Sequence, residues 1–190
     1  EDVPLDEARR QFDVNVFGLA RLTQLVLPAM RAQGSGTIIN ISSIGGKIYE
    51  PLGGWYHATK FAVEGLSDSM RLELAPFGIH VVIVEPGAIR TEWTGISADS
   101  LEAVSGATAY ADQALRMSKT FRGADRNPRL GSDPDVVAKV IARAATAKRP
   151  KTRYLVGQGA RPIVYLRRVL PDRAFDRVMH ATLAIGSKLG

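Results

Sequence analysis

Two short, almost entirely apolar runs constrain the fold of this chain more than any other feature of its sequence. They occupy residues 37–41 and 79–84, and each follows a longer segment whose apolar side chains recur at helical spacing. A strand that is apolar on nearly every residue is buried on both faces, as in a parallel sheet covered by helices. Alternation of helices with such strands favours parallel crossover connections. We therefore expect an α/β fold with a doubly wound parallel sheet.

The helices that precede these strands have recognisable ends. The first is expected over residues 5–33, with Gly34 where a C-terminal cap belongs. Pro28 is positioned to kink this helix or to end its regular part. The second is expected over residues 55–74, because Pro76 stops the pattern shortly afterwards.

The second half of the chain is less clearly patterned. Residues 85–127 are rich in small side chains and predict only one or two weak helical segments. The S-D-P sequence at residues 132–134 opens a further helix, with its serine or aspartate as the N-cap. Residues 152–156 predict a short third strand, and two short amphipathic helices are expected after it. Three strands are few for such a sheet, so we expect an incomplete one within a single domain over residues 1–190.

The composition is that of an ordinary globular protein, with 45% hydrophobic and 23% charged residues. Cysteine is absent, which excludes disulfides, thiolate metal sites and a cysteine nucleophile. His80 and His180 lack metal-ligand spacing, so no metal is expected. The apolar runs are far shorter than the roughly 18 residues of a membrane span, and no signal peptide is visible. These features favour a cytoplasmic protein.

The net charge of +6 is unevenly distributed. From residue 139 onward there are twelve Lys or Arg residues against two acids, whereas the preceding part carries thirteen against seventeen. Such a basic end attracts phosphates or an anionic membrane surface, or is simply a solvated face. Residues 161–177 combine arginines with apolar helix faces, as in peripheral membrane segments. Nucleic-acid binding is not expected, because no recognised motif accompanies the charge.

Tyr56 and Lys60 form the first candidate for chemistry. Their spacing of four at the start of a helix brings a phenol and an ammonium onto one face, one turn apart. A free tyrosine has a pKa of about 10, and a neighbouring cation favours the phenolate. The pair is therefore a tunable proton donor of the kind that carbonyl reduction or alcohol oxidation requires.

Other polar residues are predicted to meet this pair. Ser43 follows a buried strand, so it lies at the carboxyl end of the sheet, where α/β proteins bind ligands. A glycine-rich loop joins Ser43 to Tyr56 and permits the serine hydroxyl to fold back beside the phenol. Asn15 is an amide within an apolar helix, and its alternative explanation is a bond to a helix carbonyl. A Pro86-Gly87 turn at the end of the next strand faces the same crevice.

Together these residues resemble the classical short-chain dehydrogenase/reductase family. The matches, in the order and spacing of the family, are Asn15 in N-V-F-G, Ser43 in I-N-I-S-S, the Y-x-x-x-K of Tyr56 and Lys60, and Pro86-Gly87 followed by Thr91. The resemblance extends over essentially the whole chain and implies a Rossmann-like fold.

The resemblance also implies a role for each residue. Tyr56 would exchange a proton with the substrate oxygen, which Ser43 would hold. Lys60 would lower the pKa of Tyr56 and bind the nicotinamide ribose, and Asn15 would fix a water that links Lys60 to solvent. The residues implied in cofactor binding are Tyr56, Lys60, Pro86, Gly87, Ile89 and Thr91.

The activity implied is that of an NAD- or NADP-dependent oxidoreductase acting on a small-molecule alcohol or ketone. Residues 85–131 would form the substrate-binding loop region and residues 157–190 a C-terminal helical tail. The tail loosely resembles that of hydroxysteroid and retinol dehydrogenases, which suggests a bulky apolar substrate. Family members usually pair through their two long helices, so a homo-oligomer is expected.

Two family features are missing from the sequence: the glycine-rich cofactor turn and the N-N-A-G segment. We therefore expect the chain to be the C-terminal portion of such a domain, with the edge of the strand at residues 37–41 left unpaired. Without the pyrophosphate site at a helix N-terminus, the 190 residues alone are expected to bind cofactor poorly.

Three alternatives remain open at this point. A serine hydrolase built on Ser43 and His57 is disfavoured, because there is no G-x-S-x-G elbow and the helix turns His57 away from the Tyr56 side. A non-catalytic scaffold that kept the fold is the second. A peripheral membrane protein that uses residues 161–177 is the third, and this role could coexist with an enzyme. Separately, Tyr49, Trp55 and Trp93 either line an apolar substrate pocket or cover the edge of the core.

Overall fold

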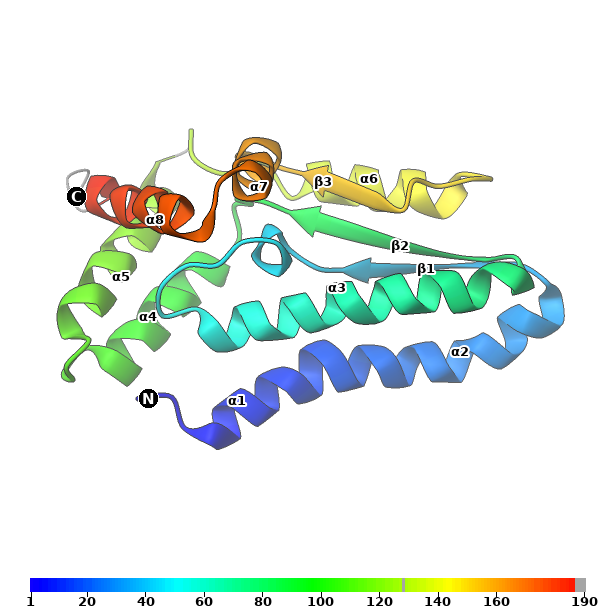
Figure 1. The fold of residues 1–190 in the computed structure, drawn as a ribbon, viewed down its shortest axis with the longest axis horizontal. Coiled ribbons are helices and arrows are strands. Elements are labelled where there is room, and N and C mark those ends of the chain that lie inside the picture. The colour runs from blue at the N-terminus through cyan, green and yellow to red at the C-terminus, as the bar shows by residue number, and fades with distance from the viewer. Residues whose placement is uncertain (128, 187–190) are drawn as a thin grey trace.

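A computed structural model describes residues 1–127 and 129–186 of the chain (Figure 1). The elements follow one another as α1 (Leu5–Phe12), η1 (Asp13–Gly18), α2 (Leu19–Gln33), β1 (Gly36–Ile41), η2 (Ile44–Gly46), α3 (Gly54–Leu74), η3 (Ala75–Phe77), β2 (Ile79–Pro86), α4 (Trp93–Ser105), α5 (Ala111–Arg126), α6 (Asp135–Thr146), β3 (Arg153–Val156), α7 (Ala160–Val169) and α8 (Asp172–Gly186).

The described strands form one parallel sheet in the order β1-β2-β3. Gly36 of β1 pairs with Ile79 of β2, and Ile83 of β2 pairs with Arg153 of β3. Figure 1 shows α2 and α3 on one side of the sheet and α6 on the other. The predicted α/β fold with a doubly wound parallel sheet of three strands is confirmed, and β1 is an edge strand within the described residues.

Two buried clusters hold these layers together. The first lies between the sheet and helix α3 and is formed by Ile38, Met70, Leu74, Ile79 and Val81. Every residue of the central strand β2 from Ile79 to Glu85 is buried except His80, which explains the apolar run in the sequence. The second cluster fixes the C-terminal helices to the loop after β1 and is formed by Ile48, Val164, Phe175 and Met179.

The long first helix is continuous, but its irregular segment lies near Asn15 and not at Pro28, where it was predicted. Pro28 does not end the regular part, because α2 runs past it to Gln33 and is capped by Gly34 in the left-handed conformation (φ 66°). Pro28 is exposed, so water can bond the carbonyl that its missing N–H leaves free. The irregular part is instead the π-helical segment η1, which contains Asn15.

The one or two weak helical segments predicted within residues 85–127 are two well-formed helices, α4 and α5, so the weakness of the pattern was misleading. Helices α4 and α5 pack closely against each other, and Ala98 and Ala114 are fully buried between them. The small residues that weaken the apolar pattern in the sequence are what allows this close approach. Arg122 of α5 also forms an ion pair with Asp99 of α4 at 2.7 Å.

The remaining elements follow the predicted order. Helix α6 begins one residue after Pro134, and the Asp133 side chain accepts a hydrogen bond from the Asp135 backbone N–H at 3.0 Å. Helices α7 and α8 form the predicted tail as far as Gly186, and the last residues of the predicted tail, 187–190, lie outside the described residues. No described helix is both long enough and apolar enough to span a bilayer.

Candidate active site

Tyr56 and Lys60 lie in the first two turns of α3 and face the carboxyl end of β1. The Lys60 Nζ donates a hydrogen bond to the Ile41 carbonyl at 3.2 Å, which ties it to the last residue of that strand. The same nitrogen is 5.8 Å from the centre of the Tyr56 ring. The structure therefore brings the predicted phenol and ammonium together at the predicted edge of the sheet.

The electrostatics of this pair differ from the expectation. Burial raises the pKa of Tyr56, and the charge of Glu50 adds to this, while a hydrogen bond from Ser43 acts in the opposite direction. Burial also lowers the pKa of Lys60. The lowering of the Tyr56 pKa that we expected from Lys60 is thus not present in this structure, because the removal of the phenol from water dominates.

Ser43 caps the short turn that leads from β1 toward α3. Its Oγ accepts a hydrogen bond from the Gly45 backbone N–H at 3.0 Å, which leaves the hydroxyl proton for Tyr56. A methyl group on Gly45 would come within 3.0 Å of the Tyr56 ring, so the loop approaches the phenol closely only because this residue is glycine. The loop folds the serine back beside the phenol as predicted.

His57 holds this loop in place. Its Nε2 accepts a hydrogen bond from the Glu50 backbone N–H at 3.1 Å, so its Nδ1 carries the proton and donates to the Gly45 carbonyl at 2.9 Å. Both ring nitrogens are therefore occupied, and no Ser43–His57 hydrolase pair is formed. In the sequence, His57 was considered only as a hydrolase residue, and its role in closing the loop was missed.

Asn15 connects the first helix to α3 rather than bonding to its own helix. Its Nδ2 donates to the Oγ1 of Thr59 at 3.1 Å, and that oxygen in turn donates to the Tyr56 carbonyl at 2.8 Å. Single π-helical turns such as η1 often occur at functional sites. Thr59 is fully buried and was missed by the sequence reasoning, although its place between Tyr56 and Lys60 was a signal.

The segment after β2 continues along the same edge of the sheet. The Gly87 backbone N–H donates to the Val156 carbonyl at 2.8 Å, and a methyl group on Gly87 would lie 2.5 Å from the Gln158 carbonyl oxygen. Ile89 forms a bridge with Ser132. The next residues include exposed Thr91, whose Oγ1 accepts a hydrogen bond from the Trp93 backbone N–H at 3.3 Å.

The three aromatic residues have different surroundings. The Trp93 ring lies 5.6 Å from the Tyr56 ring and equally far from that of Phe121, so it forms a wall beside the phenol. Tyr49 packs on Phe175 in the core, with ring centres 5.4 Å apart.

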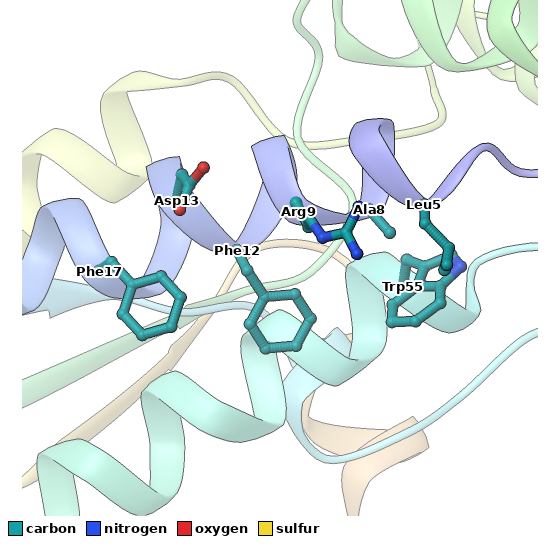
Figure 2. Close-up of a pocket in the computed structure, with 7 residues that line it drawn as sticks. All are labelled: Leu5, Ala8, Arg9, Phe12, Asp13, Phe17 and Trp55. Carbon is teal, nitrogen blue, oxygen red and sulfur yellow. The ribbon is translucent and has the colours of Figure 1, made fainter.

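Trp55 belongs to a different surface, where it faces Phe12 at 6.4 Å (Figure 2). The surface hollow beside it has a volume of about 460 Å³ and includes neither Tyr56 nor Ser43. It is lined by Leu5, Ala8, Arg9, Phe12, Asp13, Phe17 and Trp55. In the described part of the chain, no group of three or more acidic or histidine side chains is placed to hold a metal.

Comparison with known proteins identifies the family. Residues 1–101, more than half of the chain, match the family model described as short chain dehydrogenase. The chain belongs to the short-chain dehydrogenase family. The resemblance inferred from Asn15, Ser43, Tyr56 and Lys60 is thereby confirmed at the level of the family.

Several family members are similar over nearly the whole chain. An uncharacterized oxidoreductase of Bacillus subtilis, YusZ, is 35% identical over 96% of this chain and 65% of its own length. The NADPH-dependent 3-dehydrocapnine reductase of Ornithobacterium rhinotracheale is 33% identical over 96% of this chain and 65% of its own length. A solved short-chain dehydrogenase from Streptomyces avermitilis is 33% identical, with a TM-score of 0.67 over 99% of this chain and 63% of that one. The chain thus spans about two thirds of the length of these short-chain dehydrogenases.

Proposed function

We propose that the protein is an oxidoreductase that transfers a hydride between a nicotinamide cofactor, NAD or NADP, and an alcohol or carbonyl substrate, with Tyr56 as the proton donor and acceptor. The observation that carries this proposal is the convergence of Ser43, Tyr56 and Lys60 at one edge of the sheet, braced by Asn15. The proposal is supported by family membership and by relatives that are named oxidoreductases.

Tyr56 is poised as an acid. The phenol is protonated at neutral pH and can therefore donate a proton to the oxygen of a carbonyl that is being reduced. Its pKa is raised by burial in this structure, so the donation requires the bound substrate and cofactor to stabilise the phenolate. Ser43 acts beside it. Its oxygen accepts the Gly45 N–H, and its hydroxyl proton, which bonds Tyr56 in this structure, would turn to the substrate oxygen when substrate is bound.

The donors at this edge fit the nicotinamide end of the cofactor. One proton of the Lys60 ammonium is used by the Ile41 carbonyl, and the other two can bond ribose hydroxyls. Pro86, Gly87, Ile89 and Thr91 would border the nicotinamide ring. When bound, the cofactor supplies or accepts the hydride, and the protein contributes orientation and the proton. The named NADPH dependence of the Ornithobacterium reductase supports this cofactor class.

The wall formed by Trp93 and Phe121 favours an apolar substrate. The Trp93 ring lies beside Tyr56 and the Phe121 ring packs on Trp93, and both residues belong to the α4–α5 unit, which begins after Thr91. We therefore assign residues 85–131 to substrate binding, as a helical unit rather than the loop expected from the sequence.

The experiment that tests this function uses the full-length protein with NADH and NADPH as separate cofactors. We expect saturable fluorescence changes on binding of at least one cofactor and its oxidation with a panel of apolar ketones. The reverse reaction is followed with the matching alcohols. Failure to bind either cofactor, together with no turnover in either direction, would contradict the proposal.

A second copy of the chain fits the outer faces of the long helices. Leu22 of α2 and Leu72 of α3 are large apolar side chains with exposed fractions of 67% and 72%. A homo-oligomer paired through these helices would cover them. Sedimentation of Leu22→Glu with Leu72→Glu should show dissociation, whereas Tyr165→Glu on α7 should leave the assembly unchanged.

The basic tail fits an anionic membrane surface. The exposed face of α7 carries Arg161, Tyr165, Arg168 and Val169. Arg167 forms an ion pair with Asp172 at 2.8 Å. This combination of cations with apolar side chains is typical of peripheral helices. Co-sedimentation with anionic liposomes that disappears at high salt is the expected result, and no binding to such liposomes would contradict it.

A further inference from the structure

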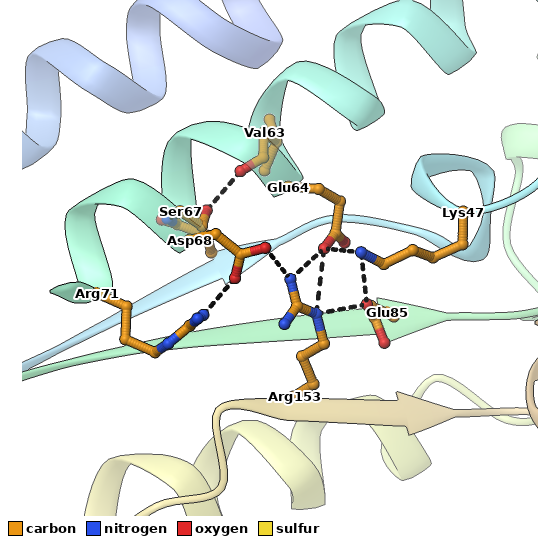
Figure 3. A network of polar contacts seen from close by, with 9 residues as sticks. Lys47, Val63, Glu64, Ser67, Asp68, Arg71, Glu85 and Arg153 are labelled. Atoms are coloured by element: carbon orange, nitrogen blue, oxygen red, sulfur yellow. Dashed lines mark hydrogen bonds and ion pairs between the residues drawn. The ribbon is translucent and has the colours of Figure 1, made fainter.

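A cluster of charged side chains is buried between α3, the sheet and the loop after β1 (Figure 3). At its centre are Glu64 of α3 and Glu85 of β2, whose exposed fractions are only 4% and 2%. Two carboxylates in such a place are unfavourable unless cations and hydrogen bonds compensate them. Their presence beside the candidate active site therefore calls for a physical explanation.

Lys47 and Arg153 supply the compensating charge. The Lys47 Nζ lies 2.8 Å from the Glu64 Oε2 and 3.9 Å from the Glu85 Oε1. Arg153 reaches the same two oxygens, with its Nη2 3.1 Å from Glu64 and its Nε 3.2 Å from Glu85. At the outer side, Arg153 also pairs with Asp68 at 2.6 Å.

The charged residues of the cluster come from segments that also carry proposed site residues, except Arg153, whose strand β3 pairs with β2. Lys47 follows Ser43 by four residues, and Glu64 follows Lys60 by four, one helical turn away. Glu85 directly precedes Pro86. The cluster is therefore the place where the serine loop, the tyrosine helix and the proposed nicotinamide-binding segment are joined.

The hydrogen bonds of the two carboxylates are incomplete when both are ionised. In the described part of the chain, Glu64 Oε1 is buried without a hydrogen-bond partner. Glu85 Oε1 is also buried and, although it forms an ion pair with Arg153 at 3.2 Å, it accepts no well-aligned hydrogen bond. A buried acceptor without a donor is costly, and a proton placed between the two carboxylates gives each of them a partner. Burial and the charge of Glu64 outweigh the two cations and raise the pKa of Glu85 to about 7, which makes Glu85 the proton carrier.

We propose that Glu64 and Glu85 share one proton, and that with Lys47 and Arg153 they form a positioning cluster that holds the Ser43 loop against the helix of Tyr56. The inference rests on the proposed function. Glu64 binds both cations through its Oε2, while Glu85 carries the shared proton. When Glu85 loses that proton, two carboxylates repel each other beneath the loop, and Ser43 is no longer held beside Tyr56.

The groups that face Glu85 define the pH dependence of this cluster. They are Glu64 on α3, Lys47 on the loop and Arg153 on β3. We expect kcat to fall as pH rises through about 7, with KM for the cofactor unchanged, because the loop rather than the cofactor site is displaced.

Kinetics of three variants of the full-length protein test the proposal. Glu85→Gln mimics the protonated acid, so kcat at pH 7 should stay within about twofold of wild type and the fall at higher pH should disappear. Glu64→Gln should lower kcat by at least about tenfold, because the loop loses its anchor. Glu73→Gln, an exposed acid near the end of α3, makes the same change in charge and should have no effect.

A second measurement does not depend on activity. Amide hydrogen exchange of residues 43–48 should quicken in Glu64→Gln and in Lys47→Met, but not in Glu85→Gln or Glu73→Gln. Lys47 is partly exposed, so Lys47→Met keeps the proposal testable if Glu64→Gln does not fold. If this exchange pattern were observed in a protein without any oxidoreductase activity, the proposed function would be refuted, while the role of the cluster in holding the loop would be supported.

Two results would overturn the positioning cluster. One is Glu85→Gln lowering kcat as much as Glu64→Gln, which would show that both carboxylates must be ionised. The other is unchanged exchange of the loop in both Glu64→Gln and Lys47→Met, which would show that the cluster does not hold it.

Discussion

The Nδ2 of Asn15 lies 3.1 Å from the Oγ1 of Thr59, and this bond joins the π-helical segment η1 to the helix that carries Tyr56. The two residues are 44 positions apart in the sequence. Thr59 also donates to the Tyr56 carbonyl, so one buried hydroxyl connects the first helix with the backbone of the proposed proton donor.

Replacing this hydroxyl should cost stability. Thr59→Val keeps the shape of the side chain but removes both hydrogen bonds and leaves the Asn15 amide without its acceptor. We expect a loss of about 1–3 kcal/mol in the free energy of unfolding, measured by urea denaturation. Thr146→Val, on the exposed surface of α6, removes a comparable bond to a helix carbonyl and should cost much less.

His57→Ala should release the loop that carries Ser43. The imidazole holds the Gly45 carbonyl and the Glu50 N–H, and both lose their partner in the variant. We expect faster amide exchange at Glu50 and a fall in kcat that exceeds any change in KM. His80→Ala, at an exposed position of β2, is the control. Unchanged exchange at Glu50 would contradict the role assigned to His57.

Two glycines near Tyr56 should respond differently to alanine. A methyl group on Gly45 would lie 3.0 Å from the Tyr56 ring and 3.2 Å from His57 Nδ1, so Gly45→Ala should displace the phenol and lower kcat. Gly54, in the first turn of α3, has nothing within 4 Å of the added atom. Gly54→Ala should keep activity and raise stability by up to about 1 kcal/mol. Equal activities of the two variants would argue against a closely packed loop.

Stability should fall as pH rises toward neutrality because of Glu85. Its pKa is raised from 4.5 to about 7 on folding, so the folded state holds the proton more tightly. The resulting stabilisation is complete below about pH 4.5 and is lost as pH rises through about 7. At about 1.4 kcal/mol per pKa unit, the loss is about 3–4 kcal/mol. Urea denaturation across this range should show the decline in wild type and not in Glu85→Gln.

The strands and the order of elements could be predicted from local patterns. The apolar run of β2 reflects burial on both faces of that strand. In the edge strand β1 only Ile38 and Asn40, which share one face, are buried, and Ile41 is exposed. Helices α4 and α5 were predicted only weakly, because alanines such as Ala98 and Ala114 contribute little to an apolar pattern even when fully buried.

The meeting of Ser43, Tyr56 and Lys60 was predictable from strand ends and helix spacing. The links between distant residues were not. Asn15 reaches Thr59 and Arg153 reaches Glu64 across 44 and 89 positions, and no local pattern encodes such pairs. The pKa of Tyr56 was predicted with the wrong sign, because spacing shows the nearby cation but not the burial of the phenol.

The most direct test of the account compares Tyr56→Phe with Tyr49→Phe in the full-length protein. Both variants remove one phenolic hydroxyl, but the Tyr49 hydroxyl donates to Asp176 in the tail. We predict that Tyr56→Phe keeps cofactor binding and loses at least about a hundredfold in kcat, the contribution of a general acid. Tyr49→Phe should retain turnover. Near wild-type kcat in Tyr56→Phe would contradict the central claim that this phenol carries the proton.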